Sequence, residues 1–260
     1  MAGIVRSIGQ LQFRYPVLQK PINFTAQILM RLLGTRILCG ELKGLRINAI
    51  GANPGFLLGT SEALEQSLIA KFLTVGDVVY DVGANIGFYC LLGARRVGPT
   101  GKIYAFEPTP TLVSRIKENA ALNSFDQIEV VQAAVCDRTG TLDFCVEGDL
   151  SVSNGIRKID NESKRLTVPC TRIDDFAINH LPPKLILIDI EGAELEALQG
   201  AMQTISTHRP ILMIEVHWLG KRFLDFVEER LVPLGYVATT YDGQPLPEGH
   251  VRYHCLLVAN

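Results

Sequence analysis

The sequence predicts an α/β fold, in which a mostly parallel sheet carries helices on both faces and an antiparallel strand at one edge. From residue 75 onward, short apolar runs typical of buried strands alternate with segments whose apolar residues recur at helical spacing. Parallel strands joined by helical crossovers form a sheet that is covered on both sides. The last two apolar runs have no helix between them, so residues 236–242 and 253–260 are expected to pair antiparallel.

Strand and helix signals alternate clearly in the first half of the predicted domain. Ile86 to Arg96 follows a glycine-bearing turn and has the apolar content of a helix. Thr109 and Pro110 predict the start of a second helix, since they supply an N-cap and a first-turn proline. Three strands are expected around these helices, at 77–83, 102–108 and 128–135.

The middle of the chain interrupts this rhythm. Two strand-like runs, 140–146 and 165–173, flank the polar segment 147–163, which has turn residues and no apolar period and is therefore expected to be a loop. A fourth core strand is expected at 184–192 and a fifth at 210–217.

Two more helices are expected in the second half. The first carries Leu195, Leu198, Met202 and Ile205 on one face. The second contains Phe223, Phe226 and Val227 and ends before Pro233 and Gly235.

Composition limits the class of protein. The chain has 260 residues, 47% of them hydrophobic and 20% charged, which suits one α/β domain, expected at 61–260, after an N-terminal extension at 1–60. The net charge of −2 gives no reason to expect a nucleic-acid partner. The six cysteines include no C-x-x-C pair, so the sequence predicts neither a zinc site nor a redox dithiol, and a reducing, cytoplasmic location is expected.

The N-terminal residues 1–40 hold five basic residues and no acid. A basic, apolar arm of this kind can make peripheral contact with an anionic membrane. The favoured alternative is a helix that packs on the main domain with its arginines in solvent. No apolar run reaches the ~18 residues that a membrane span requires.

The turn after the first strand carries Asp81, Gly83, Asn85 and Gly87, a spacing that differs from the G-x-G-x-x-G of dinucleotide sites. Glycines let the backbone approach a ligand, and the amides of a helix start favour an anion such as a carboxylate. Asp81 would attract a cationic group. The turn therefore favours a ligand that has both an ammonium and a carboxylate.

The second strand ends in Glu107, 24 residues after Gly83. This offset is close to the ~20 residues at which an acid binds the ribose of an adenine nucleoside. An amino-acid end together with an adenosine end describes S-adenosylmethionine, which is the expected cofactor.

The motifs "DVGANIGFYCLL", "FEP", "LIDIEGAELEALQG" and "IEVH" together resemble the FkbM family of S-adenosylmethionine-dependent methyltransferases, over about residues 60–257. The resemblance implies the Rossmann-like, seven-stranded class I methyltransferase sheet with strand order 3-2-1-4-5-7-6. It also implies O-methylation of a hydroxyl on a sugar, a glycolipid or a natural product. The cofactor-binding residues it implies are Asp81, Gly83, Asn85 and Gly87 at the methionine end, Glu107 at the ribose, Ala133, Ala134 and Val135 beside the adenine, and Asp189 next to the reacting methyl.

The segment "IDIEGAE" places acids at positions 189, 191 and 194. Asp189 and Glu191 share a face if the strand continues through them, and both are expected at the catalytic mouth. Glu215 and His217 repeat this pattern on the next strand. Removing the proton of an acceptor hydroxyl needs a base, and Glu191, Glu215 and His217 are the unranked candidates.

Some alternatives remain open. Asp189, Glu191, Glu215 and His217 are adequate ligands for a divalent metal ion, although the sequence has no dedicated metal spacing and this use is not favoured. An NAD-dependent oxidoreductase and a non-catalytic nucleoside-binding module are the other functions considered. The loop 147–163 and the N-terminal arm are expected to shape the acceptor pocket. The other histidines are expected to be structural or at the surface: His180, His208, His250 and His254.

Overall fold

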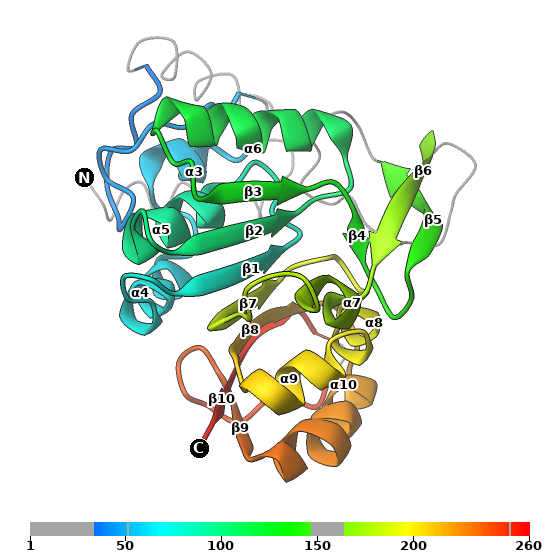
Figure 1. The fold of residues 1–260 in the computed structure, drawn as a ribbon. Coiled ribbons are helices and arrows are strands. Elements are labelled where there is room, and N and C mark those ends of the chain that lie inside the picture. Colours follow the sequence, from blue (N-terminus) through cyan, green and yellow to red (C-terminus); the bar gives the residue numbers. More distant parts are fainter. Residues whose placement is uncertain (1–33, 51, 147–163, 250) are drawn as a thin grey trace, which may run out of the picture.

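A computed structural model describes residues 34–50, 52–146, 164–249 and 251–260, and its centre is a seven-stranded sheet (Figure 1). The strand order β3-β2-β1-β7-β8-β10-β9 corresponds to 3-2-1-4-5-7-6 when only the strands of this sheet are numbered, which confirms the expected topology. Strands β1, β2, β3, β7 and β8 are parallel, and β10 runs antiparallel to both of its neighbours. The strands are β1 Val78–Val82, β2 Lys102–Phe106, β3 Ile128–Val131, β7 Leu185–Ile188, β8 Ile211–Val216, β9 Tyr236–Thr240 and β10 Tyr253–Ala259.

Helices cover both faces of the sheet because successive strand residues point to opposite sides. Val79 and Leu187 pack in a core cluster that includes residues of α4, α5 and α6, whereas Tyr80 and Ile188 pack in a second cluster with α8, α9 and α10. The helices are α3 Pro54–Leu58, α4 Ala63–Phe72, α5 Phe88–Val97, α6 Pro110–Leu122, α7 Ile173–Ala177, α8 Glu194–Gln199, α9 Met202–His208 and α10 Lys221–Phe226.

The third predicted strand is shorter than expected, because it ends at Val131 and does not continue to Val135. The N–H of Ala133 donates to the carbonyl of Val131 at 2.9 Å, which closes a tight turn and breaks the ladder. Residues Ala134–Val135 then form β4 in a separate three-stranded sheet with β5 Gly140–Val146 and β6 Lys164–Thr171. This small sheet lies beyond the carboxyl ends of β2 and β3 (Figure 1).

The helix expected from Leu195 to Ile205 is two helices, α8 and α9, separated at Gly200 and Ala201. A Cβ at Gly200 would lie 2.1 Å from the carbonyl oxygen of Cys136, so only glycine fits there. The Asp174 carboxylate accepts hydrogen bonds from the N–H groups of Gln203 and Thr204, at 3.1 and 2.7 Å. It thereby satisfies amides that a continuous helix would have bonded internally.

The segment before β1 packs on the main sheet domain. Ile37, Leu42 and Ile47 are almost fully buried in the same core cluster as α4 and α5. Residues 1–33, which include most of the basic arm, lie outside the described residues, as does the loop 147–163. None of the helices in the described ranges has the length and apolarity that a bilayer crossing requires.

Candidate active site

The turn after β1 is held against the ends of two neighbouring strands. The N–H groups of Gly83 and Ala84 both donate to the carbonyl of Phe106 at the end of β2. On the other side, Gly83 touches β7 so closely that a Cβ would lie 2.0 Å from the carbonyl oxygen of Asp189. Gly83 and Asn85 both have positive φ, at 89° and 52°. The turn predicted from the sequence therefore lies against Asp189, a residue that was predicted to belong to the same site.

Two buried carboxylates lie beneath this turn. Asp81 accepts a hydrogen bond from the Cys90 thiol of α5 at 3.0 Å. Glu107 accepts from the N–H of Asn85 at 3.1 Å and from the N–H of Thr109 at 2.9 Å. Burial raises the pKa of Asp81 to about 6 and the pKa of Glu107 to about 7, the second despite these amide hydrogen bonds. Neither carboxylate has an ion-pair partner among the described residues.

A further buried polar atom lies at the same turn. The side-chain oxygen Oδ1 of Asn85 has no hydrogen-bond partner within the described chain. Buried polar atoms normally have a partner, and a group without one needs an explanation. Together with the two carboxylates, this acceptor suits a ligand that brings ammonium and hydroxyl donors.

The unfolding free energy of an Asp81→Asn variant is expected to rise with pH relative to that of the unchanged protein. The pKa of Asp81 is about 6 in the fold against an ordinary 3.8, so the folded state holds this proton more tightly. The resulting stabilisation is complete below about pH 4 and is lost as the pH rises through about 6. The asparagine variant has no such proton, so the difference should change by up to ~3 kcal/mol between about pH 4 and about pH 8.

Urea denaturation of both proteins across this pH range measures the difference directly. Cys90 and Glu107 face Asp81 and remain in both proteins, so their own titration largely cancels. A difference that stays constant with pH would contradict the assignment of a raised pKa to Asp81.

The structure separates the three residues expected beside the adenine. Ala133 lies in the turn between β3 and β4, whereas Ala134 and Val135 belong to the small sheet and pair with β6. Ala133 and Ala134 are buried. The expectation that all three end the third strand is therefore wrong, and their place beside a cofactor stays a prediction.

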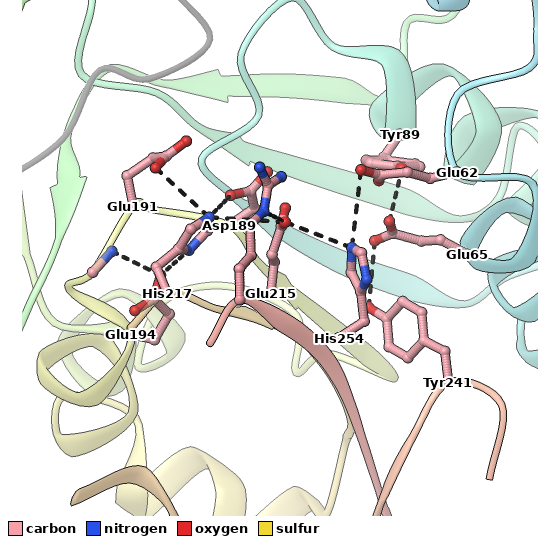
Figure 2. A network of polar contacts seen from close by, with 12 residues as sticks. Glu62, Glu65, Tyr89, Asp189, Glu191, Glu194, Glu215, His217, Tyr241 and His254 are labelled. Atoms are coloured by element: carbon pink, nitrogen blue, oxygen red, sulfur yellow. Dashed lines mark hydrogen bonds and ion pairs between the residues drawn. The ribbon is translucent and has the colours of Figure 1, made fainter. Parts of the chain in front are cut away.

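The four expected catalytic residues meet at the carboxyl ends of β7 and β8 (Figure 2). The Nε2 atom of His217 lies 3.6 Å from a carboxylate oxygen of Glu191, and 3.8 Å from oxygens of Asp189 and Glu215. Glu191 joins this group from a turn and not from the strand that was expected to carry it. The strand ends at Ile188, so Glu191 lies in a turn with φ of 55° and not on the strand face of Asp189.

Glu194 is a site residue to which the sequence assigned no role. At the start of α8 it is fully buried, and its Oε1 accepts from the N–H of Gly192 at 2.9 Å. The Nδ1 atom of His217 lies 2.8 Å from the same oxygen, and since a carboxylate only accepts, Nδ1 carries the hydrogen. Burial opposes a positive charge on His217, but the hydrogen bond and charge of Glu194, with Glu215 and Glu191, raise its pKa.

The polar network continues past Glu215 toward the segment that precedes β1 (Figure 2). Arg252 forms an ion pair with Glu215, and the Nε2 atom of His254 lies 3.7 Å from Glu215 and 3.9 Å from Glu62. The expectation that His254 is merely structural or at the surface therefore misses its place beside Glu215. Neither its isolated position in the sequence nor the Glu62-x-x-Glu65 spacing indicated this contact.

The neighbouring carboxyl groups of Glu62 and Glu65 differ in pKa. Burial, together with the hydrogen bond and charge of Glu62, raises the pKa of Glu65 well above its usual range. Hydrogen bonds from Glu65 and Tyr89, with the charges of His254 and Arg252, outweigh burial and lower the pKa of Glu62. The hydroxyl of Tyr89 lies 2.7 Å from Glu65, and that of Tyr241 lies 3.4 Å from it.

Backbone strain is concentrated around this network. Among the described residues, six other than glycine have positive φ, and four of them are Glu62, Asn85, Glu191 and Trp218, which adjoins His217. Such conformations cost about 1–3 kcal/mol each and often occur at functional sites, where the surrounding structure holds them in place.

The strand order and the polar site at the carboxyl ends of its parallel strands are those of a class I methyltransferase sheet. The model of the FkbM methyltransferase domain matches residues 81–237, which is more than half of the chain. The chain therefore belongs to the FkbM methyltransferase family.

Three curated relatives are similar in sequence. Hexuronic acid methyltransferase AglP of Haloferax volcanii is 27% identical over 54% of this chain and 56% of its own length. The 2-O-methyltransferase NoeI of Sinorhizobium fredii is 28% identical over 58% of this chain and 68% of its own length. The 31-O-demethyl-FK506 methyltransferase FkbM of Streptomyces tacrolimicus is 28% identical over 60% of this chain and 62% of its own length.

A solved structure of methyltransferase FkbM from Methylobacillus flagellatus aligns with 91% of this chain and 58% of that chain, at 19% identity and a TM-score of 0.47. The chain thus spans little more than half the length of this protein and of AglP.

Proposed function

We propose that this protein transfers a methyl group from S-adenosylmethionine to a hydroxyl of a sugar, a glycolipid or a natural product. Membership of the FkbM family supports methyl transfer, and the names of NoeI and of the FK506 enzyme specify transfer to oxygen in those proteins. The observation that carries the proposal is the set of buried acceptors at the β1 turn, where Asp81, Glu107 and the Asn85 oxygen have no cationic partner among the described residues.

These residues fit S-adenosylmethionine as the cofactor. We expect the Glu107 carboxylate to accept hydrogen bonds from the ribose hydroxyls, and Asp81 and Asn85 to accept them from the ammonium. Gly83 and Gly87 keep the turn free of side chains, and Asp189 follows directly on the other side of Gly83. Ala133 and Ala134 remain the residues proposed for the adenine.

The side chains around His217 are proposed to act on the acceptor hydroxyl. Bound S-adenosylmethionine supplies an electrophilic methyl group on a sulfonium. The residues of this chain orient the acceptor oxygen and take up its proton, a contribution of ~10²–10⁴-fold in rate for a well-placed base. The carboxylate of Glu215 forms an ion pair with Arg252, which holds it beside His217.

Calorimetric titration with S-adenosylmethionine and with NAD tests the cofactor. Saturable binding of the first at micromolar concentration and none of the second is the expected result. Binding of NAD alone would favour an oxidoreductase and overturn the proposal.

A transfer assay with a labelled methyl donor and a mixed glycan and glycolipid extract then tests the reaction. Mass analysis of the labelled product is expected to place the methyl group on a hydroxyl oxygen. Label on nitrogen or carbon would contradict O-methylation while leaving methyl transfer in place.

A further inference from the structure

Nε2 of His217 is buried at the centre of the active site and has no hydrogen-bond partner within the described chain. The side chain is only 2% exposed. The nearest carboxylate oxygens, from Glu191, Asp189 and Glu215, lie at 3.6–3.8 Å, which is too long for hydrogen bonds. Nε2 thus points into a group of three carboxyl groups without a hydrogen bond to any of them.

The spacing of these atoms is close to that of a metal coordination shell. Asp189, Glu215 and His217 each offer one ligand atom, and these atoms all lie within 4.8 Å of one another. Ligands at ~2.1 Å from an ion lie ~3–3.4 Å apart when adjacent and ~4.2 Å apart when opposite. Side-chain movements of less than ~1 Å would therefore complete the shell.

The imidazole is also oriented as metal-binding histidines are. Its Nδ1–H donates to the buried Glu194 carboxylate at 2.8 Å, which leaves the other nitrogen to face the acids. A metal-binding histidine nearly always donates its second ring N–H to a carboxylate or carbonyl in this way.

Charge favours a cation at the same point. Asp189, Glu191 and Glu215 bring three carboxyl groups around Nε2, and Arg252 forms an ion pair with Glu215.

We infer that Asp189, Glu215 and His217 bind a divalent metal ion, with Glu194 as the residue that orients His217. One imidazole with carboxylate oxygens and no thiolate suits an ion such as Mn²⁺. Three protein ligands leave coordination positions open, and half of the Asp189 side chain faces solvent, so the acceptor can approach from that side.

The role of the ion in the reaction rests on the proposed function. An ion held by these residues would lower the pKa of an acceptor hydroxyl bound to it. The proton of that hydroxyl would pass to the Glu191 carboxylate. The electron pair left on oxygen would form the bond to the methyl carbon, and the electron pair of the broken C–S bond would go to the sulfonium sulfur. His217 acts in this scheme as a ligand and not as the base.

Titration of the metal-free full-length protein with Mn²⁺, followed by electron paramagnetic resonance, tests the site without any methyl donor. We expect saturable binding of one ion per chain. Asp189→Asn and His217→Gln should each weaken binding at least ~10-fold, and Glu194→Gln should weaken it ~10–100-fold. Asp189 is half exposed, so its variant should fold even if a buried substitution does not.

The second group of possible ligands, Glu62, Glu65 and His254, provides the matched control. Glu65→Gln is expected to leave Mn²⁺ affinity unchanged, since Glu65 contacts Tyr89 and Tyr241 and not Glu215. Loss of binding in this variant but not in Asp189→Asn would place the ion at the wrong cluster and overturn the inference. Absence of saturable binding to the unchanged protein would also overturn it.

A chelator arm separates this inference from the proposed function. Methyl transfer that continues at full rate in EDTA would refute the metal and leave the methyltransferase intact. Saturable Mn²⁺ binding without any methyl transfer would support the site and count against the proposed reaction.

Discussion

Replacing His217 with glutamine is expected to lower the rate of methyl transfer by ~10²-fold or more, because the variant loses the nitrogen on which the acceptor chemistry depends. The affinity for S-adenosylmethionine should change by less than ~3-fold, since the proposed cofactor residues lie mainly on the β1 turn and at Glu107. Steady-state kinetics with the identified acceptor, together with calorimetry for the cofactor, measure both effects.

His208→Gln is the matched control, because His208 is exposed at the end of α9 and has the same chemical change. Its activity should equal that of the unchanged protein. Retention of more than about a third of the activity in His217→Gln would remove His217 from the reaction. It would also favour a role of the protein as a binding module.

Replacing Gly83 with alanine is expected to reduce the unfolding free energy by ~3–4 kcal/mol, the sum of a left-handed backbone penalty and a steric clash. Gly83 has φ of 89°, and its new Cβ would lie 2.0 Å from the backbone carbonyl oxygen of Asp189. Because that neighbour is backbone, β1 and β7 would have to separate where the cofactor is proposed to bind. Urea denaturation measures the loss.

Gly76→Ala isolates the clash from the backbone penalty. Gly76 has a similar φ of 93°, but the nearest atom to its Cβ would be the Thr100 hydroxyl at 3.9 Å. Only the penalty of ~1–2 kcal/mol is expected there. Equal losses of unfolding free energy in the two variants would mean that β7 moves aside for the methyl group of Gly83→Ala at no cost in free energy.

Much of the fold could be predicted from the sequence because its strands are short apolar runs with clear stops. The buried runs at β1 and β8 and the Thr109–Pro110 start of α6 all lie where they were expected. Three boundaries were wrong: the third strand ends at Val131, the fourth ends at Ile188, and the helix after it breaks at Gly200. The first depends on the hydrogen bond from Ala133 to Val131 and the last on a close contact with the distant Cys136, and apolar periodicity reveals neither.

The candidate site was predictable where an acid follows a buried strand, as Asp189 does, or ends one, as Glu215 nearly does. Burying such an acid costs free energy, so its presence there indicates a functional site. Glu194 sits in a helix start, where an acid is ordinary, and its bond to His217 spans 23 residues. Arg252, His254 and the Glu62–Glu65 pair come from opposite ends of the sequence, and only the fold brings them together.

The polar network of Figure 2 lies only partly within the stretch that matches the family model. The family match at 81–237 contains the β1 turn, Asp189, Glu191 and His217, but five members of the network lie outside it: Glu62, Glu65, Tyr241, Arg252 and His254. Under the proposed function, the shared stretch binds the methyl donor and acts on the acceptor hydroxyl, and the flanking stretches help to choose the acceptor. Two family members that align well over the shared stretch can therefore modify different molecules, and their flanks are the place to look for the reason.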